Sequence, residues 1–402
     1  MNKPCISIDI SKGKSFYQGF ENYNQIFSKA KEVIHDIKGF SEIKELTNRL
    51  LNKTGSIPIV VFESTGIYHK PLQTYLDEQN IKYTIVSPLL SAKVRKSQIR
   101  STKTDKKDCQ NIAKVFYMND CKIFDKQETI YDEIRNKSRY YDTVTEEKKR
   151  LKVEFRRLLD IVYPNFDKLY TNVYGGISLL VIKEYPHPEL IRKKSVKAIT
   201  ANLRNKSTHK EAYCQKEAEK IKIFSENCAS GCVKQSYTVH QMKKVLNNLI
   251  IKTDELNEEL ESLIFLAKET VNFRLIKSIS GIGENLAARL TAEIGDIKKF
   301  NSADSLVAYA GIDPKIYRSG KISGEGLRIT KKGNKHLRTL LYLAVTSMVK
   351  TKRDNIIVDF YNKKKRQERA MSSKAAFIAC SNKLLRIIYS MCKNGCLFNN
   401  HK

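Results

Sequence analysis

Residues 4–20 read PCISIDI, SKGK and SFYQGF, and this stretch decides the fold of the N-terminal region. The two apolar-rich segments predict β-strands, and the Ser-Lys-Gly-Lys sequence between them predicts a turn. Asp9 lies inside the first predicted strand, where aspartate is disfavoured. We therefore expect the chain to open with a β-hairpin that carries a carboxylate in a strand interior.

Helices and strands alternate after this hairpin. Apolar residues at helical spacing predict a helix at 39–51, and the run IPIVVF predicts a buried strand at 57–62 that is followed by Glu63. The same kinds of pattern predict a helix at 68–79, a strand at 82–87 and a helix at 108–118. This order indicates an α/β layer with a mixed sheet.

The middle of the chain is predicted to be helical. Residues 130–162 are charged and helical in pattern up to Pro164, whereas residues 165–235 predict only short helices. A heptad seam follows, in which Thr253 fills one position and leucines fill the others: Leu246, Leu249, Leu256, Leu260 and Leu263. Such a seam predicts helix pairing, either with the 130–162 segment or between subunits.

Residues 275–296 resemble a helix-hairpin-helix element with a Gly-Ile-Gly turn. Gly281 and Gly283 would let backbone amides approach a phosphate at the start of the second helix. A plain connection between two helices explains the same turn. We therefore predict three regions, which are an α/β domain at 1–125, a helical and coiled-coil region at 126–268, and a mostly α domain at 269–402.

The charge balance favours nucleic acid as a partner. The 402 residues include 73 Lys and Arg against 43 Asp and Glu, which gives a formal net charge of +30. Tyr and Phe are interleaved with the dense basic runs, which lie at 93–107, 148–157, 331–338 and 363–369. This combination is less typical of a membrane surface than of a nucleic-acid surface, and such binding is steeply salt dependent.

The sequence predicts a cytoplasmic protein with reduced thiols. No apolar run is long enough for a membrane span, and the N-terminus lacks the pattern of a signal peptide. The nine cysteines are scattered, as is usual for free thiols. A zinc site is the alternative for two C-x3-C pairs, Cys228 with Cys232 and Cys392 with Cys396, although no His follows at finger spacing.

Four acidic residues are candidates for a metal site. Asp9 lies within a strand, Glu63 follows a buried-type strand, and Asp105 and Asp108 share one face at the start of a helix. Carboxylates that converge repel one another unless a cation lies between them, and hard oxygen ligands favour Mg²⁺. Two such ions can cleave a phosphodiester. The order of these acids is the one expected of an RNase H-like nuclease core.

Each acid also has a structural explanation. Asp108 could be a first-turn residue that faces the helix dipole, Asp105 could be ordinary loop polarity, and Glu63 could simply end a strand. Asp9 is the hardest to explain in this way, because a strand interior gives a structural aspartate little reason to be there. It is the combination of all four that favours a metal site.

Two groups of motifs carry a resemblance to a known family. The strings SIDISK (7–12), VVFESTGIYHKPL (60–72) and STKTDKKD (101–108) resemble the N-terminal domain of the DEDD transposases of the insertion-sequence 110 family, which includes the Piv-like DNA invertases. The second domain of that family is similar to the C-terminal strings SISGIG, TAEIGD, FNSADSLVAYAGIDP, RSGK and ITKKGNKHLRTLLYLA. The matches lie in the right order at both ends of the chain.

This resemblance implies a RuvC-like fold in which Asp9, Glu63, Asp105 and Asp108 bind the metal. It also implies a serine nucleophile, which falls on Ser319 in YRSGK, and Ser323 is the competing candidate four residues away. Attack by that serine would leave a protein–DNA phosphoserine.

The resemblance further implies a structured guide RNA that pairs with donor and target DNA, and an oligomer. At least a dimer is needed to hold two DNA partners, and we favour a tetramer. The basic residues that we predict to bind nucleic acid are Lys103, Lys106, Lys107, Arg318, Lys331, Lys332, Lys335 and Arg338.

Three other functions are compatible with parts of the sequence. A RuvC-like junction nuclease would use the four acids alone and would leave the second domain unexplained. A site-specific DNA invertase would use both domains. A nucleic-acid-binding protein without catalytic activity would use only the basic regions and the helix-hairpin-helix element.

Overall fold

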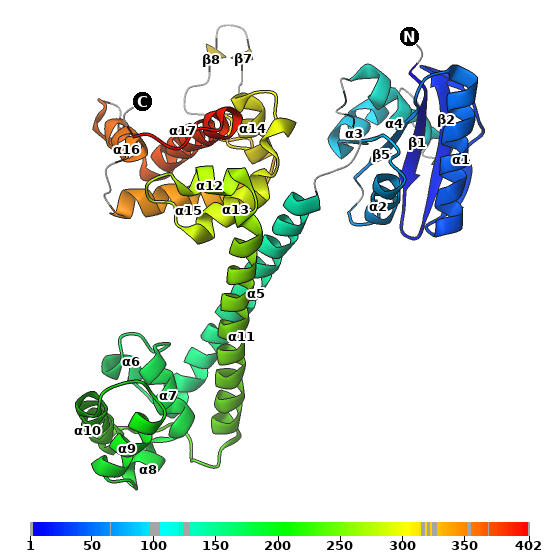
Figure 1. Ribbon diagram of the computed structural model, residues 1–402. Helices are drawn as coiled ribbons and strands as arrows, with labels where there is room; N and C mark the ends of the chain where they lie inside the picture. The colour runs from blue at the N-terminus through cyan, green and yellow to red at the C-terminus, as the bar shows by residue number, and fades with distance from the viewer. Residues whose placement is uncertain are drawn as a thin grey trace. The chain divides into compact units, whose positions relative to one another are not determined.

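The computed structural model describes residues 3–64, 66–96, 105–119, 121, 123, 129–314, 318–319, 322–323, 328–351, 355–368 and 370–400. It divides into two compact units, Met1–Glu128 and Thr129–Lys402 (Figure 1). The end of the first unit is close to the predicted boundary at 125. The predicted regions 126–268 and 269–402 lie together in the second unit, and their division from one another stays a prediction.

A mixed β-sheet forms the centre of the first unit. The strands are β1 (Cys5–Ile10), β2 (Lys14–Asn22), β3 (Gln25–Ile26), β4 (Lys31–Ile34), β5 (Ile59–Glu63) and β6 (Tyr83–Val86). Their order is β3-β2-β1-β5-β6, and β4 also pairs with β2. β1 is antiparallel to β2 and parallel to β5, which is parallel to β6. The predicted hairpin, mixed sheet and two later strands are confirmed, whereas the short strands β3 and β4 were not predicted.

Helices cover both faces of this sheet because its strands are apolar on both sides. The helices are α1 (Ile37–Thr54), α2 (Lys70–Glu78), α3 (Pro88–Lys96) and α4 (Asp105–Met118). Ile6 and Ile8 of β1 pack with α1 and α2, whereas the alternate residue Cys5 packs with α4. Helix α3 was not predicted, and its last residues belong to the basic run at 93–107.

Two long antiparallel helices begin the second unit. Helix α5 (Thr129–Val162) pairs with α11 (Tyr237–Lys268), and Figure 1 shows them side by side. The Tyr140 hydroxyl donates to Glu255 at 2.8 Å, and the Gln241 amide donates to Glu154 at 3.1 Å. The predicted seam therefore pairs with the 130–162 segment. Within this seam Leu246, Leu249 and Leu263 are buried, and Leu256 and Leu260 are half-buried.

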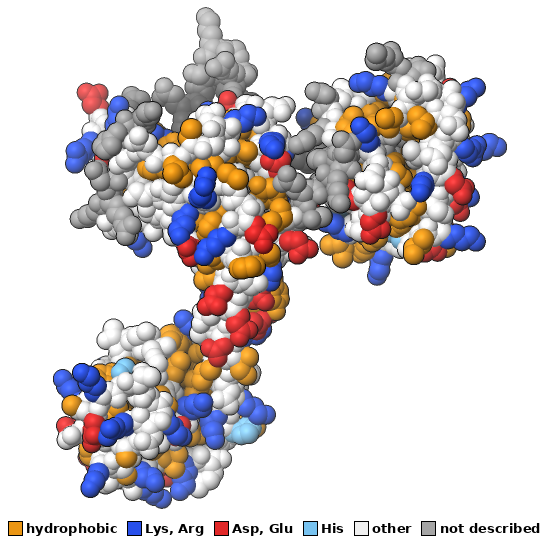
Figure 2. Space-filling model, in the orientation of Figure 1, with side chains coloured by type: hydrophobic (Ala, Val, Ile, Leu, Met, Phe, Trp, Pro, Cys, Tyr) orange, Lys and Arg blue, Asp and Glu red, His pale blue; other side chains and the backbone are white. Residues whose placement is uncertain are grey.

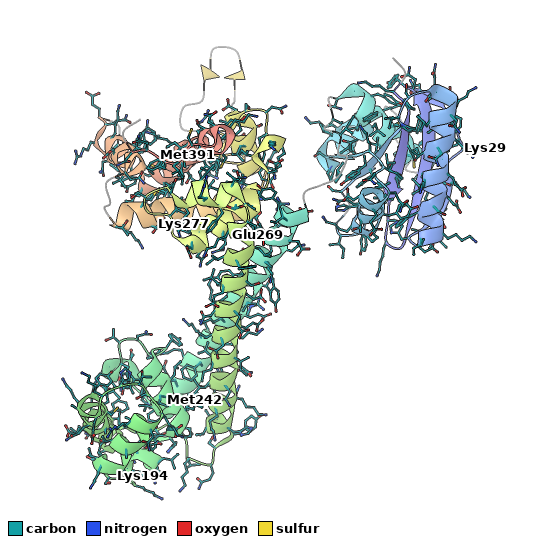
Figure 3. All side chains as sticks on the ribbon, in the orientation of Figure 1. Lys29, Lys194, Met242, Glu269, Lys277 and Met391 are labelled. Carbon is teal, nitrogen blue, oxygen red and sulfur yellow. The ribbon has the colours of Figure 1, made fainter. Side chains whose placement is uncertain are left out.

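A small helical module connects these two long helices. It comprises α6 (Phe166–Leu169), α7 (Gly176–Glu184), α8 (Pro188–Arg192), α9 (Val196–Asn205) and α10 (Glu211–Asn227). Its core joins Phe166, Ile182 and Leu203 to Tyr163 of the connection after α5 and to Met242 of α11, which is labelled in Figure 3. The residues for which only short helices were predicted thus form a module that shares one core with the ends of α5 and α11.

The C-terminal part of the second unit is mostly helical. Its elements are α12 (Val271–Lys277), α13 (Glu284–Ile294), η1 (Ile297–Lys299), α14 (Ala303–Ala310), β7 (Arg318–Ser319), β8 (Ile322–Ser323), α15 (Lys335–Thr351), α16 (Ile356–Arg366) and α17 (Ser373–Asn394). Leu290, Leu341 and Leu384 lie in its core. Among the described residues, no helix is long and apolar enough to cross a membrane, and the nine cysteines are free thiols.

A turn joins α12 to α13 where the helix-hairpin-helix element was predicted. Gly281 has φ +93°, and a Cβ added there would lie 2.7 Å from Cγ of Met348. The missing side chain therefore makes room for α15, which is a packing reason for this glycine. Glu284, in the first turn of α13, forms ion pairs with Lys268 and Lys277. This carboxylate places negative charge where a phosphate was expected to bind, so phosphate binding by this turn stays a prediction.

We expect Gly281→Ala to lower the free energy of unfolding of the second unit by about 1–3 kcal/mol, because a left-handed φ and an overpacked contact are both penalised. The measurement is urea unfolding followed by the helical circular dichroism signal. Gly283→Ala is the matched control, since Gly283 has φ −83° and no atom within 4 Å of an added Cβ. Equal effects of the two substitutions would contradict this explanation.

Candidate active site

Asp9 and Glu63 lie next to each other at the ends of two parallel strands. The register pairs Ile8 of β1 with Phe62 of β5, so the next residues along the two strands are Asp9 and Glu63. Neighbouring strands are about 4.8 Å apart. Both acids are half-buried. The parallel pairing therefore brings together two carboxylates that are far apart in the sequence.

Both acids lie on the face of the sheet that α4 covers. Side chains alternate along a strand, and Cys5 and Val61 on this face pack against Ile112 and Val115 of α4. Asp9 and Glu63 follow the same alternation. The buried Ser7 hydroxyl also belongs to this face, and no hydrogen-bond partner is found for it among the described residues.

Helix α4 brings Asp108 to this end of the sheet. The Cys109 thiol donates to the carbonyl oxygen of Phe16 at 3.2 Å, and Phe16 is the residue that faces Asp9 across the β1–β2 ladder. Asp108 precedes Cys109 and is 8% exposed. The structure thus places Asp9 and Glu63 side by side, and the contact of Cys109 brings the start of α4, which includes Asp108, near the same end of the sheet.

The fourth acid, Asp105, is the first residue of α4, one turn before Asp108, and its side chain lies outside the described residues. Lys107 is exposed on the same helix. The Lys106 side chain and the whole of Lys103 also lie outside the described residues. The convergence of all four acids therefore stays a prediction.

The chemistry of these donors suits a hard divalent cation. Aspartate and glutamate oxygens are the ligands that Mg²⁺ prefers, and half-buried carboxylates on one edge repel one another without a cation. Among the side chains that the structure describes, no three His, Cys, Asp or Glu form a group that could hold a metal ion. A complete ligand set would therefore need Asp105 or a rearrangement of the described acids.

Ser319 lies in a short hairpin of the second unit. It ends β7 and faces Ile322 of β8, and Arg318 faces Ser323. The side chains of these four residues lie outside the described part of the chain. Both candidate serines thus belong to one hairpin, on opposite strands of a two-residue ladder.

The two ends of the loop that carries this hairpin are held together. Pro314 forms a β-bridge with Ile329, the Thr330 amide donates to the carbonyl of Asp313 at 3.0 Å, and the Thr330 hydroxyl donates to the Asp313 carboxylate at 2.7 Å. Each of these contacts joins residues on opposite sides of the hairpin. The loop therefore has a closed base.

Asn334 connects this base to α15. Its side-chain oxygen accepts from the amides of His336 and Leu337 at 3.0 and 3.1 Å, so it caps the helix. Its own backbone amide donates to Tyr309 at 2.7 Å. Gly333 beside it must lack a side chain, because a Cβ would lie 2.4 Å from the Tyr309 carbonyl oxygen.

A buried carboxylate holds Asn334 in turn. Glu293 of α13 is 1% exposed, accepts from the Asn334 amide at 2.6 Å, and pairs with Arg139 of α5 at 3.2 Å. Burial opposes ionisation of Glu293, but the bonds from Arg139 and Asn334 outweigh it and hold its pKa below the ordinary value. This network joins α5, α13 and the base of the hairpin loop.

The predicted phosphate-binding residues of this region differ in their surroundings. Lys331, Lys332 and Lys335 are exposed and make no ion pair among the described residues. Arg338 is half-buried, and its guanidinium donates to the carbonyl of Ala310 at 2.9 Å. Arg338 therefore has a packing role that was not predicted.

Sequence reasoning missed Glu293, Asn334 and Arg139. Two of them had a signal, since Asn334 directly precedes an apolar-periodic helix, as a cap does, and Glu293 interrupts an otherwise apolar helix face. Arg139 had none, because it is one cation among many along α5.

Comparison with known families agrees with this arrangement. Residues 6–164 match the DEDD transposase model of IS110 elements, and residues 273–362 match the model for transposases of the IS116/IS110/IS902 family. The first match contains the sheet and the four acids, and the second contains the Ser319 hairpin. The chain belongs to the IS110 family of transposases.

Relatives of this IS110-family chain include a transposase and two inverting proteins. It is 31% identical over 158 residues to the transposase for insertion sequence element IS1111A of Coxiella burnetii. The aligned segment covers 38% of this chain and 42% of that protein. It is similar to the pilin gene-inverting proteins of Moraxella bovis (27% identity over 52% of this chain and 62% of that protein) and Moraxella lacunata (24% over 98% and 97%). The matched part of this chain thus covers less than two thirds of the first two relatives.

The Glu293 network should support this second unit of the IS110-family chain in a pH-dependent way. We expect Glu293→Gln to lower the free energy of unfolding at pH 7 by about 1–3 kcal/mol. This range is modest because Arg139 is half-exposed and solvent screens its ion pair. Because the pKa of Glu293 is lowered by folding, its ionised form stabilises the protein above the unfolded-state pKa, and this stability is lost as the pH falls through the folded-state value.

The measurement is urea unfolding of wild type and Glu293→Gln at pH 7 and under acidic conditions. Glu146→Gln is the control, because Glu146 and its partner Lys149 are 62% and 63% exposed and their ion pair should contribute little. A difference between wild type and Glu293→Gln that does not shrink at low pH would contradict the proposed role of the ionised carboxylate.

Proposed function

We propose that this protein is a DNA recombinase that moves an insertion sequence by cutting and rejoining DNA strands. The observation that carries the proposal is the presence, in one chain, of the neighbouring acids Asp9 and Glu63 at the ends of β1 and β5 and of a serine hairpin with a closed base. A nuclease that acts through the acids alone has no use for the second feature. The family to which the chain belongs supports the same conclusion.

In this proposal Asp9, Glu63, Asp105 and Asp108 hold Mg²⁺. The bound metal would supply Lewis-acid stabilisation of the scissile phosphate and activation of a hydroxyl. The residues themselves would orient the metal through two rigid strands and one helix. Support for this step comes from the parallel register of β1 and β5 and from the anchoring of α4 beside Phe16.

Ser319 is the proposed nucleophile of the second unit. Its hydroxyl oxygen forms a bond to the DNA phosphorus, a P–O bond to the deoxyribose breaks, and the serine proton passes to the leaving oxygen directly or through water. One phosphodiester replaces another, so the energy for rejoining is retained in the phosphoserine. Reversal of the same step on a different strand end completes the exchange without an external energy source.

The basic residues would hold phosphates rather than read bases. Lys331, Lys332 and Lys335 have no competing acid among the described side chains. Arg318 would steady the phosphate beside Ser319. We propose that sequence choice comes from a structured RNA encoded by the element, and that at least two copies of the chain hold the two DNA partners, with a tetramer as the favoured state. The proposed location is the cytoplasm.

Inversion of a DNA segment is the second candidate. It is favoured by the similarity to the pilin gene-inverting protein of Moraxella lacunata, which extends over 98% of this chain. Insertion and inversion use the same strand chemistry and differ in the arrangement of the two sites, so the products distinguish them.

The test is junction sequencing after the chain is co-expressed with its own flanking non-coding DNA and a target plasmid. We expect Ser319→Ala and Asp9→Asn each to reduce junctions by about three orders of magnitude or more, because groups that act as a unit fail together. Orientation of the joined segments separates insertion from inversion. Removal of the flanking DNA that would encode the RNA should abolish junctions in the wild type.

Matched controls separate chemistry from folding. Ser323→Ala alters the other serine of the hairpin, and Glu45→Gln alters an exposed acid of α1, on the opposite face of the sheet. Both should leave junctions at the wild-type level. Junctions that persist in Ser319→Ala but disappear in Ser323→Ala would reassign the nucleophile, and persistence in Ser319→Ala, Ser323→Ala and the double variant would contradict a serine nucleophile in this hairpin.

Metal removal tests the acids in a separate experiment. With purified protein and a labelled DNA substrate, a chelator should abolish cleavage, and added Mg²⁺ should restore it. Glu63→Gln should need a higher Mg²⁺ concentration for half-maximal cleavage, because one anionic ligand is lost. Cleavage that continues in excess chelator would contradict a metal role for these residues.

A further inference from the structure

The helical module α6–α10 has an excess of unpaired positive charge. Most of its acidic side chains form an ion pair with a neighbouring basic side chain, as Glu184 does with Lys206 and Glu211 does with Arg204. The Glu219 carboxylate accepts a hydrogen bond from the Gln215 side chain. Lysines of the module remain without an acidic partner in the described chain, and three of them, Lys193, Lys194 and Lys197, are exposed at the junction of α8 and α9. Figure 2 shows Lys and Arg side chains spread over the visible face of this module.

The junction of α8 and α9 is held firmly in place. The guanidinium of Arg192 donates to the carbonyl oxygens of Ser225 and Cys228 at the end of α10, the first at 2.6 Å. The Lys222 ammonium donates back to the carbonyl of Arg192, also at 2.6 Å. Two cations are therefore used to fix the backbone from which Lys193 and Lys194 project, and Figure 3 labels Lys194 at the outer edge of the module.

Helix α9 exposes a narrow face beside these lysines. The helix begins after Ser195, which caps its N-terminus: the Ser195 hydroxyl accepts a hydrogen bond from the Ala198 backbone amide at 3.2 Å. The exposed residues that follow are short or polar, and they are Lys197, Ala198, Ala201, Arg204 and Asn205. The buried side, with Ile199 and Leu203, faces the core of the module. Short side chains would let the helix backbone come close to a partner.

We propose that this surface, α8–α9 with Lys193, Lys194 and Lys197, binds duplex DNA. The lysines neutralise backbone phosphates, and the face of α9 lies against or within the major groove, which is wide enough for a helix in B-form DNA and too narrow in A-form RNA. No large hydrophobic or aromatic side chain of α8 or α9 is exposed. This lack disfavours single-stranded RNA, which is bound by stacking of its bases on aromatic rings.

The proposed DNA contact of the module is separate from the residues proposed to cut and rejoin DNA. The module lies at the Val162 end of α5, whereas the Glu293 network that supports the serine hairpin contacts Arg139 near the other end. A helix of 34 residues is about 50 Å long. Binding by the module therefore extends the region of DNA that the protein contacts, and it does not depend on Ser319 or on the metal.

The experiment measures how the affinity of the full chain for a random-sequence DNA duplex of about 40 base pairs depends on salt. The variant carries Lys193→Gln, Lys194→Gln and Lys197→Gln. Loss of three phosphate contacts should reduce the slope of log K against log salt by about 2 to 3, with weaker binding at every salt concentration. Circular dichroism shows whether the variant remains folded, as expected from the exposure of all three side chains.

The control variant carries Lys149→Gln, Lys206→Gln and Lys234→Gln. These lysines are ion-paired with Glu146, Glu184 and Glu189, so the net charge changes equally while no proposed contact is lost. We expect the control slope to stay at the wild-type value. Equal slopes for the two variants would overturn the proposal, since only overall charge would then matter. A slope that changes for a structured RNA and not for the duplex would overturn it in favour of RNA.

The same binding assay run with Ser319→Ala keeps this proposal distinct from the recombinase proposal. Ser319→Ala should retain the full salt slope, because the module does not contain the nucleophile. If the three-lysine variant loses slope while strand-exchange assays fail for every form of the protein, the DNA-binding surface stands and the proposed recombination does not.

Discussion

Parallel pairing of β1 with β5 is the constraint on which the acidic site depends. A parallel pair requires the chain to cross from the end of one strand back to the start of the next, and α1 makes that crossing. Its consequence is that both strands end at the same edge. Asp9 and Glu63 then occupy equivalent positions on the face that α4 covers. A shift of one residue in this register would turn one carboxylate toward the opposite core.

In the second unit, the buried charge of Glu293 fixes the positions of neighbouring elements. An ionised carboxylate that is 1% exposed is costly unless it is paired and hydrogen-bonded, and Glu293 has both an arginine and an amide as partners. Those partners come from α5 and from the residue that caps α15. The loop with the serine hairpin is thereby tied to the long helix as well as to its own domain. A polar network of this kind defines one arrangement of three elements where apolar packing alone would tolerate several.

Exposed lysines without an acidic partner in the described chain lie in two places in the second unit. In the C-terminal region the exposed lysines lie directly after the hairpin loop, and in the α6–α10 module they lie at a rigid corner between two short helices. Most acidic side chains of the module form ion pairs with other Lys and Arg residues. In the proposed complex DNA would be held at both places, and each would contribute a salt-dependent share of the affinity.

Local pattern in the sequence determined the opening hairpin, the later strands β5 and β6, the long helices and the candidate acids, because period and turn residues are local properties. The candidate serine came from the family resemblance alone. The short strands β3 and β4 carried too few residues for a period to show, and the basic residues of α3 hid its helical pattern. Only the tertiary structure decided that α5 pairs with α11, that Gly281 makes room for Met348, that Arg338 bonds to Ala310, and that Glu293 holds Asn334. These contacts join residues far apart in the chain, and their energies depend on burial and direction, which no spacing along a sequence contains.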